Sequence, residues 1–255
     1  MELKFSSPVS SHSFALRCVP GDSLRQKIVL TKCRVSPADY TSTSRDGFGN
    51  LKISGGCRKP HDTFGYHVAG TAVVQGMTVQ KCPLHPMYRY PTKYTKCGPG
   101  LTEFTEKVMR ECTVQGAETV MERAVCAMHY LYAHFRYASG VTDIRTTAEE
   151  AIALGEGVCQ DYAHIMIAVM RRLGIPARYV NGLMIGEGAT HAWVEVYTDG
   201  GWYGLDPTND LHIDDYYIKL AHGRDYADCV VDKGIFLGNA SQEQKCQWNC
   251  RWTRN

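Results

Sequence analysis

Three residues in the second half of the chain have side chains that could together catalyse acyl transfer. Cys159 follows a loop broken by glycines, Gly155-Glu156-Gly157-Val158, and directly precedes a helical pattern. His191 opens one strand-like run, and Asp206 closes the next one. A thiol, an imidazole and a carboxylate in this order can act as a nucleophile, its general base and the acid that orients the base.

The helix that follows the thiol is predicted from apolar periodicity over residues 160–173. The residues at helical spacing are Tyr162, Ile165, Met166, Val169, Met170 and Leu173. Arginines occupy the last turn, where cations suit the helix dipole, and Gly174 and Pro176 end the helix. The unpaired N–H groups of a first helical turn stabilise negative charge. Cys159 is therefore placed where a thiolate is favoured.

A hairpin is expected to bring the other two groups together. Asp199-Gly200 is typical of a two-residue turn between strands. That loop places Trp193 opposite Asp206, so that His191 lies diagonally from Asp206 on the same face, with Cβ atoms up to about 7–8 Å apart. A three-residue loop would turn Asp206 to the opposite face, so the site requires this register. The other face is expected to be core and carries Val194, Val196, Tyr203 and Leu205.

Composition excludes several classes of partner. The 255 residues carry a net charge of only +2 and no basic run, which predicts no nucleic-acid partner. The first residues contain no apolar stretch of signal-peptide length, and no run approaches the ~18 apolar residues of a membrane span, which predicts no membrane association. Eleven cysteines without a signal sequence predict reduced thiols and a cytoplasmic location.

The first hundred residues have the pattern of a small β-sandwich or barrel. Strand formers are concentrated in residues 13–19, 26–35 and 66–74, and a hairpin turn is expected at Asp46-Gly47. Four prolines in residues 77–100 indicate an ordered connector with little regular structure.

Helical patterns return after the connector. Helices are expected over about 102–112 and 118–137, followed by a short helix capped by Thr147. After the hairpin, the chain is expected to form loops and to end in strands around 229–231 and 246–252.

Several segments resemble the bacterial transglutaminase-like superfamily of papain-like proteins. The segments of the second half are 157–162, 173–180, 191–196 and 206–209, and flanking similarity lies at 46–50, 223–228 and 233–236. The resemblance covers nearly the whole chain, with its blocks in order. It implies an α+β fold: a papain-like transglutaminase core, with the nucleophile helix packed on an antiparallel sheet, preceded by an N-terminal β-sandwich domain. The expected division is 1–100 for the β domain and connector and 101–255 for the catalytic domain.

The same resemblance places the family's nucleophile on Cys159, its general base on His191 and its orienting acid on Asp206. Each residue also has a structural interpretation. Cysteine is often a small buried hydrophobe, a histidine at a strand start is usually structural, and an aspartate before Pro207 can simply end a strand. All three structural interpretations would have to coincide by accident, which favours the catalytic one.

No metal or cofactor is expected. Cys82, His85 and Cys97 could offer zinc ligands, as could Cys246 and Cys250, but their spacing does not match paired zinc-ligand motifs. The glycines near the thiol lack the lysine of a phosphate-binding loop, and there is no EF-hand calcium loop. Animal transglutaminases need calcium, whereas the bacterial relatives generally do not.

Three functions remain open from the sequence. The first is a cysteine-dependent amide or peptide hydrolase that acts on a protein or peptide substrate through a thioester. The second is a protein-glutamine acyltransferase, which needs an enclosed acceptor site. The third is a non-catalytic peptide-binding module on the same fold. The Cys159 backbone N–H is one oxyanion donor, while Gln160 and upstream helical residues are alternatives for the second. Nothing in the sequence specifies an oligomeric state.

Overall fold

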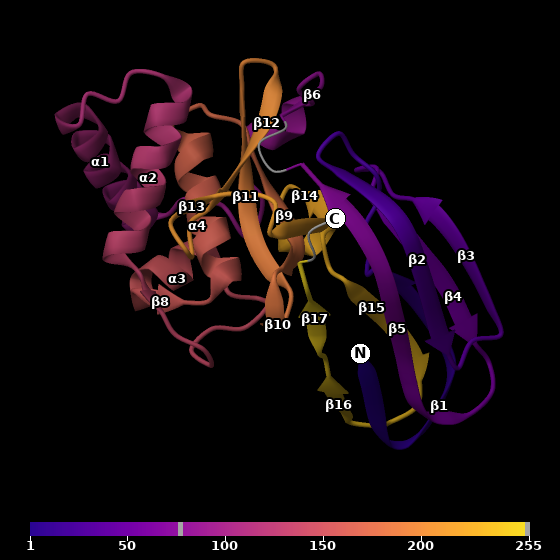
Figure 1. The fold of residues 1–255 in the computed structure, drawn as a ribbon. Helices are drawn as coiled ribbons and strands as arrows, with labels where there is room; N and C mark the ends of the chain where they lie inside the picture. Colours follow the sequence, from indigo (N-terminus) through magenta and orange to yellow (C-terminus); the bar gives the residue numbers. More distant parts are fainter. Residues whose placement is uncertain (76–78, 253–255) are drawn as a thin grey trace.

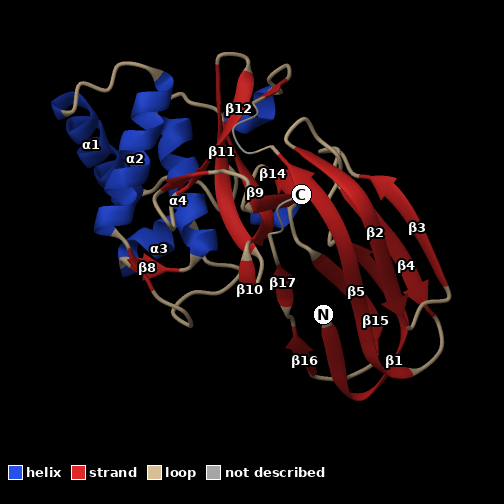
Figure 2. Cartoon of the chain, viewed as in Figure 1, coloured by secondary structure: helices blue, strands red, loops and turns tan. Residues whose placement is uncertain are grey.

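The computed structural model describes residues 1–75 and 79–252, arranged in three layers (Figure 1). Helices gather on one side, an antiparallel sheet lies in the middle, and a second group of long strands forms the other side (Figure 2). Within the described ranges, no helix is both long and apolar enough to cross a bilayer.

The helical layer consists of four α-helices and belongs to the part of the chain after the connector. They are α1 (Pro99–Val114), α2 (Val120–His134), α3 (Ala148–Leu154) and α4 (Cys159–Arg172), and the chain also has the short 3-10 helices η1 (Pro86–Arg89) and η2 (Tyr226–Asp228). Thr119 and Thr147 form capping boxes with the glutamates three residues later. The expected helices are thus confirmed, with ends that differ by a few residues.

The middle layer is a six-stranded sheet in the order β13-β12-β11-β9-β14, with β6 paired to β12. Its strands are β6 (Gln80–Lys81), β9 (Ala177–Met184), β11 (His191–Thr198), β12 (Gly201–Asp206), β13 (Leu211–His212) and β14 (Tyr217–Gly223). Helix α4 packs on β11 and β9. The shared core therefore lies between the nucleophile-bearing helix and the sheet, as the resemblance implied.

The hairpin register is confirmed. Thr198 pairs with Gly201 and Val194 with Leu205, which is the register that the two-residue turn predicts. Both turn residues, Asp199-Gly200, have positive φ, as the two-residue turns that fit twisted strands require. The four residues expected on the core face all contribute to the main hydrophobic cluster: Val194, Val196, Tyr203 and Leu205.

The third layer is built around one long strand, β1 (Glu2–Leu16). Seven strands are connected in the order β2-β5-β1-β4-β3, with β15 and β16 also paired to β1. The remaining bounds are β2 (Gln26–Ser36), β3 (Tyr40–Arg45), β4 (Leu51–Cys57), β5 (His61–Val74), β15 (Asp232–Leu237) and β16 (Gln242–Lys245). The first part of β1 pairs with β5 and β16, and its last part with β4 and β15. Ser11, at φ 48°, lies between the two parts, where the strand passes from one sheet of the sandwich to the other.

The end of the chain corrects one expectation. Residues 229–231 form no strand, because the segment turns through η2 and pairing begins only at Asp232. Strands β15 and β16 then join the N-terminal sheet, so strand pairing does not divide at residue 100. The strand expected around 246–252 is present as β17 (Trp248–Cys250), paired with β10 (Gly186–Gly188). The two-residue strands β7 (Arg136–Tyr137) and β8 (Glu156–Gly157) pair in parallel before α4.

The connector has the little regular structure that was expected. Its described residues contain β6, η1 and the first two residues of α1, and its first residues, Met77 and Thr78, lie outside the described residues. The buried guanidinium of Arg171 on α4 donates hydrogen bonds to the Tyr88 carbonyl at 3.1 Å and to Thr95 Oγ1 at 2.7 Å. The connector is therefore tied to the nucleophile helix.

A buried ionic cluster lies on the face of the middle sheet opposite α4. Glu195 accepts hydrogen bonds from Arg178 Nε at 2.6 Å and from Lys219 Nζ at 2.8 Å, and all three side chains are buried or nearly so. The Arg178 guanidinium also lies 4.1 Å from the Trp202 ring centroid. Burial alone would raise the pKa of Glu195, but the two cations outweigh it and lower that pKa.

Replacing Glu195 is expected to be strongly destabilising. Glu195→Gln leaves two buried cations without their counter-charge, so the free energy of unfolding at neutral pH should fall by about 3–5 kcal/mol. Because the folded-state pKa of Glu195 is depressed, its contribution is present above the ordinary glutamate pKa and is lost as pH falls. Urea unfolding should therefore show a difference between wild type and variant that shrinks in acid. Glu103→Gln, which removes an exposed ion pair with Lys107, should leave the melting temperature unchanged.

Candidate active site

Cys159 is the first residue of α4, and a buried carboxylate fixes its backbone. Gly155 ends α3 in the left-handed conformation at φ 74°, and Val158 is the extended N-cap of α4. Asp161 Oδ2 accepts hydrogen bonds from the Val158 N–H at 2.8 Å and from Thr142 Oγ1 at 2.7 Å. A Cβ on Gly157 would lie 2.4 Å from the same oxygen, so the approach to the thiol requires glycine. Cys159 itself is partly exposed.

His191 and Asp206 lie at the strand ends where they were expected. His191 begins β11, Asp206 ends β12, and the distance from His191 Nε2 to Asp206 Oδ2 is 2.7 Å. The carboxylate is fully buried, and the imidazole side chain is 12% exposed. Asp206 Oδ1 accepts from the Thr208 and Asn209 backbone N–H groups at 2.9 and 3.3 Å. Oδ2 also accepts from Asn209 Nδ2 at 2.8 Å and from the Tyr217 hydroxyl at 2.9 Å.

The electrostatics of the pair favour a carboxylate and an imidazolium. Burial raises the pKa of Asp206, but the hydrogen bond and charge of His191, with the donors from Asn209 and Tyr217, outweigh burial and lower it. Burial lowers the pKa of His191, but Asp206 and Cys159 outweigh this effect and raise it to about 9. Since Nε2 is engaged by Asp206, Nδ1 is the ring nitrogen left for the Cys159 thiol. The structure thus joins His191 to Asp206 by a hydrogen bond and places Cys159 near enough to help raise the pKa of His191, and the catalytic roles of the three residues remain predictions.

Aromatic rings enclose the imidazole. The Trp193 ring lies 6.5 Å from the His191 ring at an angle of 27°, and the Tyr217 ring lies 6.1 Å from His191. Sequence reasoning missed Tyr217 and Asn209 as partners of Asp206. Asn209 had a signal, because it stands in the same short loop as Asp206. Tyr217 had none, because its strand reaches the site only through its pairing with β9.

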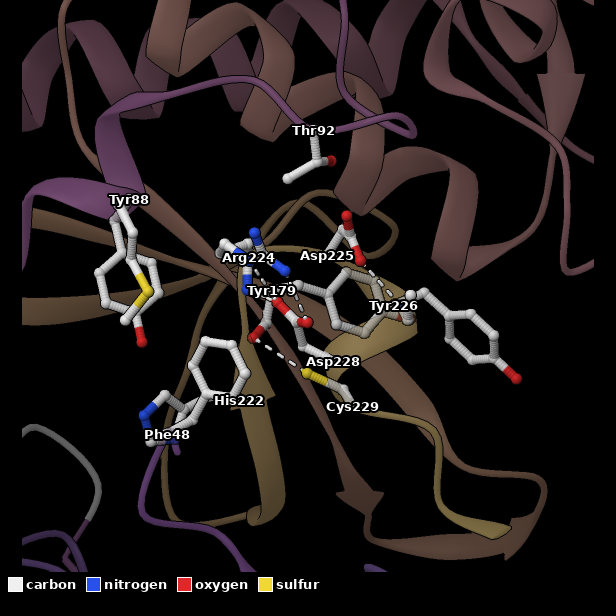
Figure 3. Close-up of polar contacts among 12 residues, drawn as sticks. Phe48, Tyr88, Thr92, Tyr179, His222, Arg224, Asp225, Tyr226, Asp228 and Cys229 are labelled. Carbon is white, nitrogen blue, oxygen red and sulfur yellow. Dashed lines mark hydrogen bonds and ion pairs between the residues drawn. The ribbon is translucent and has the colours of Figure 1, made fainter. Parts of the chain in front are cut away.

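Figure 3 shows the polar contacts of the segment that follows β14. Arg224 Nε donates to Asp228 Oδ2 at 2.9 Å, and Asp225 caps η2 by accepting from the Ala227 N–H at 2.8 Å. Cys229 points its thiol at the Tyr179 carbonyl, 3.8 Å away. Burial raises the pKa of Cys229 well above its usual range, so this thiol is unsuited to nucleophilic attack.

The other residues considered from the sequence do not form a second site in the part of the chain that the structure describes. Among the residues that the structure describes, no three His, Cys, Asp or Glu side chains gather to hold a metal ion. Gln160, considered as an oxyanion donor, directs its Nε2 to the Asp143 carbonyl at 3.5 Å. His164 is fully buried between Tyr94 and Tyr179, and burial lowers its pKa to about 3, so it stays neutral.

Comparison with known proteins agrees with this geometry. The family model of the transglutaminase-like superfamily matches residues 106–207, and that of the bacterial transglutaminase-like N-terminal region matches residues 1–73. An uncharacterized protein of Mycobacterium tuberculosis is 31% identical over 271 residues, covering 94% of this chain and 86% of the relative. This chain belongs to the transglutaminase-like superfamily.

Two further relatives extend the comparison of this transglutaminase-like protein. An uncharacterized protein of Mycobacterium leprae is 27% identical over 264 residues, covering 94% of this chain and 91% of the relative. The crystal structure of a candidate cysteine protease from Cytophaga hutchinsonii superimposes with a TM-score of 0.75 at 24% identity, covering 97% of this chain and 89% of that one. The transglutaminase-like α+β fold with an N-terminal β region is thereby confirmed.

Removing the charge of Asp206 should reverse the pKa shift of His191. In Asp206→Asn, burial acts on His191 with only the thiol opposing it, so its pKa should fall from about 9 to below the ordinary value near 6.5. In wild type the raised pKa gives stability that is complete below about 6.5 and is lost as pH rises through about 9. NMR titration of the His191 ring measures the shift. A midpoint that stays near 9 in Asp206→Asn would assign the shift to Cys159 instead.

Gly182 should not tolerate a side chain, because it lies against Trp193. A Cβ there would lie 2.3 Å from the Ile218 carbonyl oxygen and 2.3 Å from the Trp193 ring. Gly182→Ala should therefore lower the free energy of unfolding by about 1–3 kcal/mol through overpacking, or the melting temperature by roughly 2–4 °C per kcal/mol. Gly47→Ala is the control, because nothing lies within 4 Å of its Cβ position. Equal melting temperatures for the two variants would contradict this assignment.

Proposed function

We propose that this protein is a cysteine-dependent amide or peptide hydrolase with Cys159 as nucleophile, His191 as general base and Asp206 as orienting acid. The observation that supports this most strongly is the buried 2.7 Å hydrogen bond from His191 Nε2 to Asp206. It commits one ring nitrogen of the imidazole to a carboxylate and leaves the other for a partly exposed thiol at a helix N-terminus. This arrangement resembles a thiol acyl-transfer site more than a structural histidine.

The proposed reaction begins with proton transfer from the Cys159 thiol to His191 Nδ1, with Asp206 stabilising the imidazolium. The thiolate adds to the carbonyl carbon of a peptide or side-chain amide and forms a C–S bond, while the carbonyl electron pair moves to oxygen. The Cys159 backbone N–H, at the first position of α4, stabilises that oxyanion. His191 returns the proton to the departing amine, and the C–N bond breaks to leave a thioester.

The second half of the reaction resolves the thioester. His191 takes a proton from water, the hydroxide oxygen adds to the thioester carbonyl, and the C–S bond breaks with return of the proton to sulfur. The products are a carboxylic acid and the free thiol, so the enzyme is regenerated without a cofactor. We take a protein or peptide as the substrate.

A protein-glutamine acyltransferase is the alternative that uses the same chemistry. An amine then replaces water in the second half, which requires that water be kept from the thioester. The partial exposure of Cys159 favours hydrolysis over transfer, because it leaves the sulfur open to solvent. A non-catalytic peptide-binding module is the third candidate and is disfavoured by the buried charge pair.

Cys159 should be the reactive thiol among the eleven cysteines. Brief treatment with iodoacetamide at mildly acidic pH, followed by peptide mass mapping, should modify Cys159 before the others. Burial raises the pKa of several other thiols, namely Cys97, Cys126, Cys229, Cys246 and Cys250. His191→Ala should slow this modification, because the thiol loses its proton acceptor. Modification spread evenly over the exposed thiols would favour the binding module.

Cys159→Ala should abolish turnover of a peptide library and keep the melting temperature, since alanine suits the start of a helix. Cys97→Ala, which removes a half-buried thiol elsewhere, is the matched control and should keep turnover. Adding a labelled amine to the wild-type reaction separates the two products: release of a carboxylic acid indicates hydrolysis, and incorporation of the label indicates transfer. Full turnover by Cys159→Ala would disprove the nucleophile assignment.

A further inference from the structure

Tyr217 is the partner of Asp206 that comes from outside the catalytic hairpin. It is the first residue of β14, is buried, and donates its hydroxyl to Asp206 Oδ2 at 2.9 Å. Asn209, the other side chain that donates to this oxygen besides His191, belongs to the same loop as Asp206 and moves with it. Tyr217 therefore is the donor that ties the carboxylate to a separate element of the sheet.

The N-terminal β layer holds the chain on both sides of Tyr217. Before it, the Arg25 guanidinium donates to the carbonyls of Ile213, at 3.4 Å, and of Asp214. After it, the Gln26 side chain donates to the Lys219 carbonyl and accepts from the Lys219 N–H, both at 2.8 Å. Arg25, just before β2, thus holds the loop that leads into β14, and Gln26, the first residue of β2, holds β14 itself two residues after Tyr217.

Gln26 contacts β14 at Lys219, the last residue before an irregularity in the pairing of β14 with β9. The pairing of β14 with β9 shifts register between Lys219 and Ala221. The side-chain amide of Gln26 pairs with both polar backbone groups of Lys219, as a neighbouring strand would. Gln26 is only 3% exposed, so water competes little for these bonds.

We propose that the N-terminal β layer is a positioning element of the catalytic site, with Arg25 and Gln26 holding β14 so that Tyr217 keeps Asp206 directed at His191. The inference rests on the proposed function for its catalytic meaning, while its structural half concerns the His191–Asp206 hydrogen bond alone. Tyr217, Arg25 and Gln26 act through other residues and are positioning residues. The N-terminal layer thereby gains a role in the reaction without touching the substrate.

The layer also offers a matched control. Asn50 grips β14 in the same manner as Gln26, because its side chain donates to the His222 carbonyl at 2.8 Å and accepts from the His222 N–H at 2.9 Å. It does so further along the strand, beyond the register shift. Asn50→Ala therefore removes comparable contacts between the layers without loosening Tyr217.

The test uses the full-length protein and four variants: Tyr217→Phe, the double variant Arg25→Ala/Gln26→Ala, the triple combination, and Asn50→Ala. Two readouts report the site. One is the iodoacetamide rate constant of Cys159 at mildly acidic pH, which depends on the ion pair with His191. The other is the downfield proton resonance of His191 Nε2–H in protein with labelled histidine, which reports the bond to Asp206 directly. Gln26→Glu, which removes the Nε2 donor to the Lys219 and Gly21 carbonyls and keeps an acceptor for the Lys219 N–H, replaces the double variant if that one does not fold.

Tyr217→Phe and the double variant should each slow alkylation of Cys159 by about 3–10-fold and weaken or broaden the Nε2–H resonance. The triple variant should be no slower than Tyr217→Phe, because the three residues act through one hydroxyl. Asn50→Ala should keep both readouts, although its melting temperature falls. The proposal is overturned if the double variant keeps both readouts. It is also overturned if the Arg25→Ala/Gln26→Ala substitutions lower the alkylation rate by the same factor in the Tyr217→Phe protein as in wild type.

If the proposed function is wrong, the experiments would give a different set of results from those that overturn the positioning role. In that case wild type turns over no peptide and Cys159 reacts no faster than in His191→Ala. The Nε2–H resonance would still respond, or fail to respond, to the double variant. That response alone decides whether the N-terminal layer positions Asp206.

Discussion

The buried carboxylate of Asp206 is the group whose stabilisation depends on the most parts of this structure. Asp206 is fully buried, and a buried carboxylate is tolerated only when hydrogen bonds and a counter-charge replace its hydration. Its donors come from three places: the loop just after it, His191 on the neighbouring strand, and Tyr217 on β14. A one-residue slip of the hairpin would turn the carboxylate away from His191 and Tyr217, which do not move with it. Register, loop geometry and strand order are therefore parts of one constraint.

The parts of the site that could be predicted from the sequence are those governed by local physics. The start of α4 follows from apolar periodicity and from the glycines before Cys159. The placement of His191 beside Asp206 follows from the length of one turn, since a two-residue loop leaves a single register. Gly157 illustrates the limit of such reasoning. The sequence marks it as a break before the helix, but its real requirement is the Asp161 carboxylate, which lies where a Cβ would be.

What could not be predicted depends on contacts between distant segments. The pairing of β15 and β16 with β1 joins the two ends of the chain, and strand propensity does not specify a partner. The strand expected at 229–231 was wrong because Asp225 and Asp228 build a 3-10 turn around buried Cys229. Tyr217 is an ordinary strand tyrosine in the sequence. It becomes a partner of the acid only because β14 lies beside β9 and against the N-terminal layer.

The three proposed catalytic groups differ in exposure, and this difference matters chemically. The carboxylate is fully buried, whereas the imidazole and the thiol are both partly exposed. An ion pair weakens as water reaches it, so the charge that holds the proton on His191 is best kept deepest. The thiol must meet a substrate and cannot be buried in the same way. The aromatic rings of Trp193 and Tyr217 around His191 separate these two requirements, because they keep the acid and base dry while the sulfur remains accessible. If the N-terminal β layer holds Tyr217, it therefore stabilises the buried part of the site, Asp206 and His191, without restricting the accessible part around Cys159 that would bind the substrate.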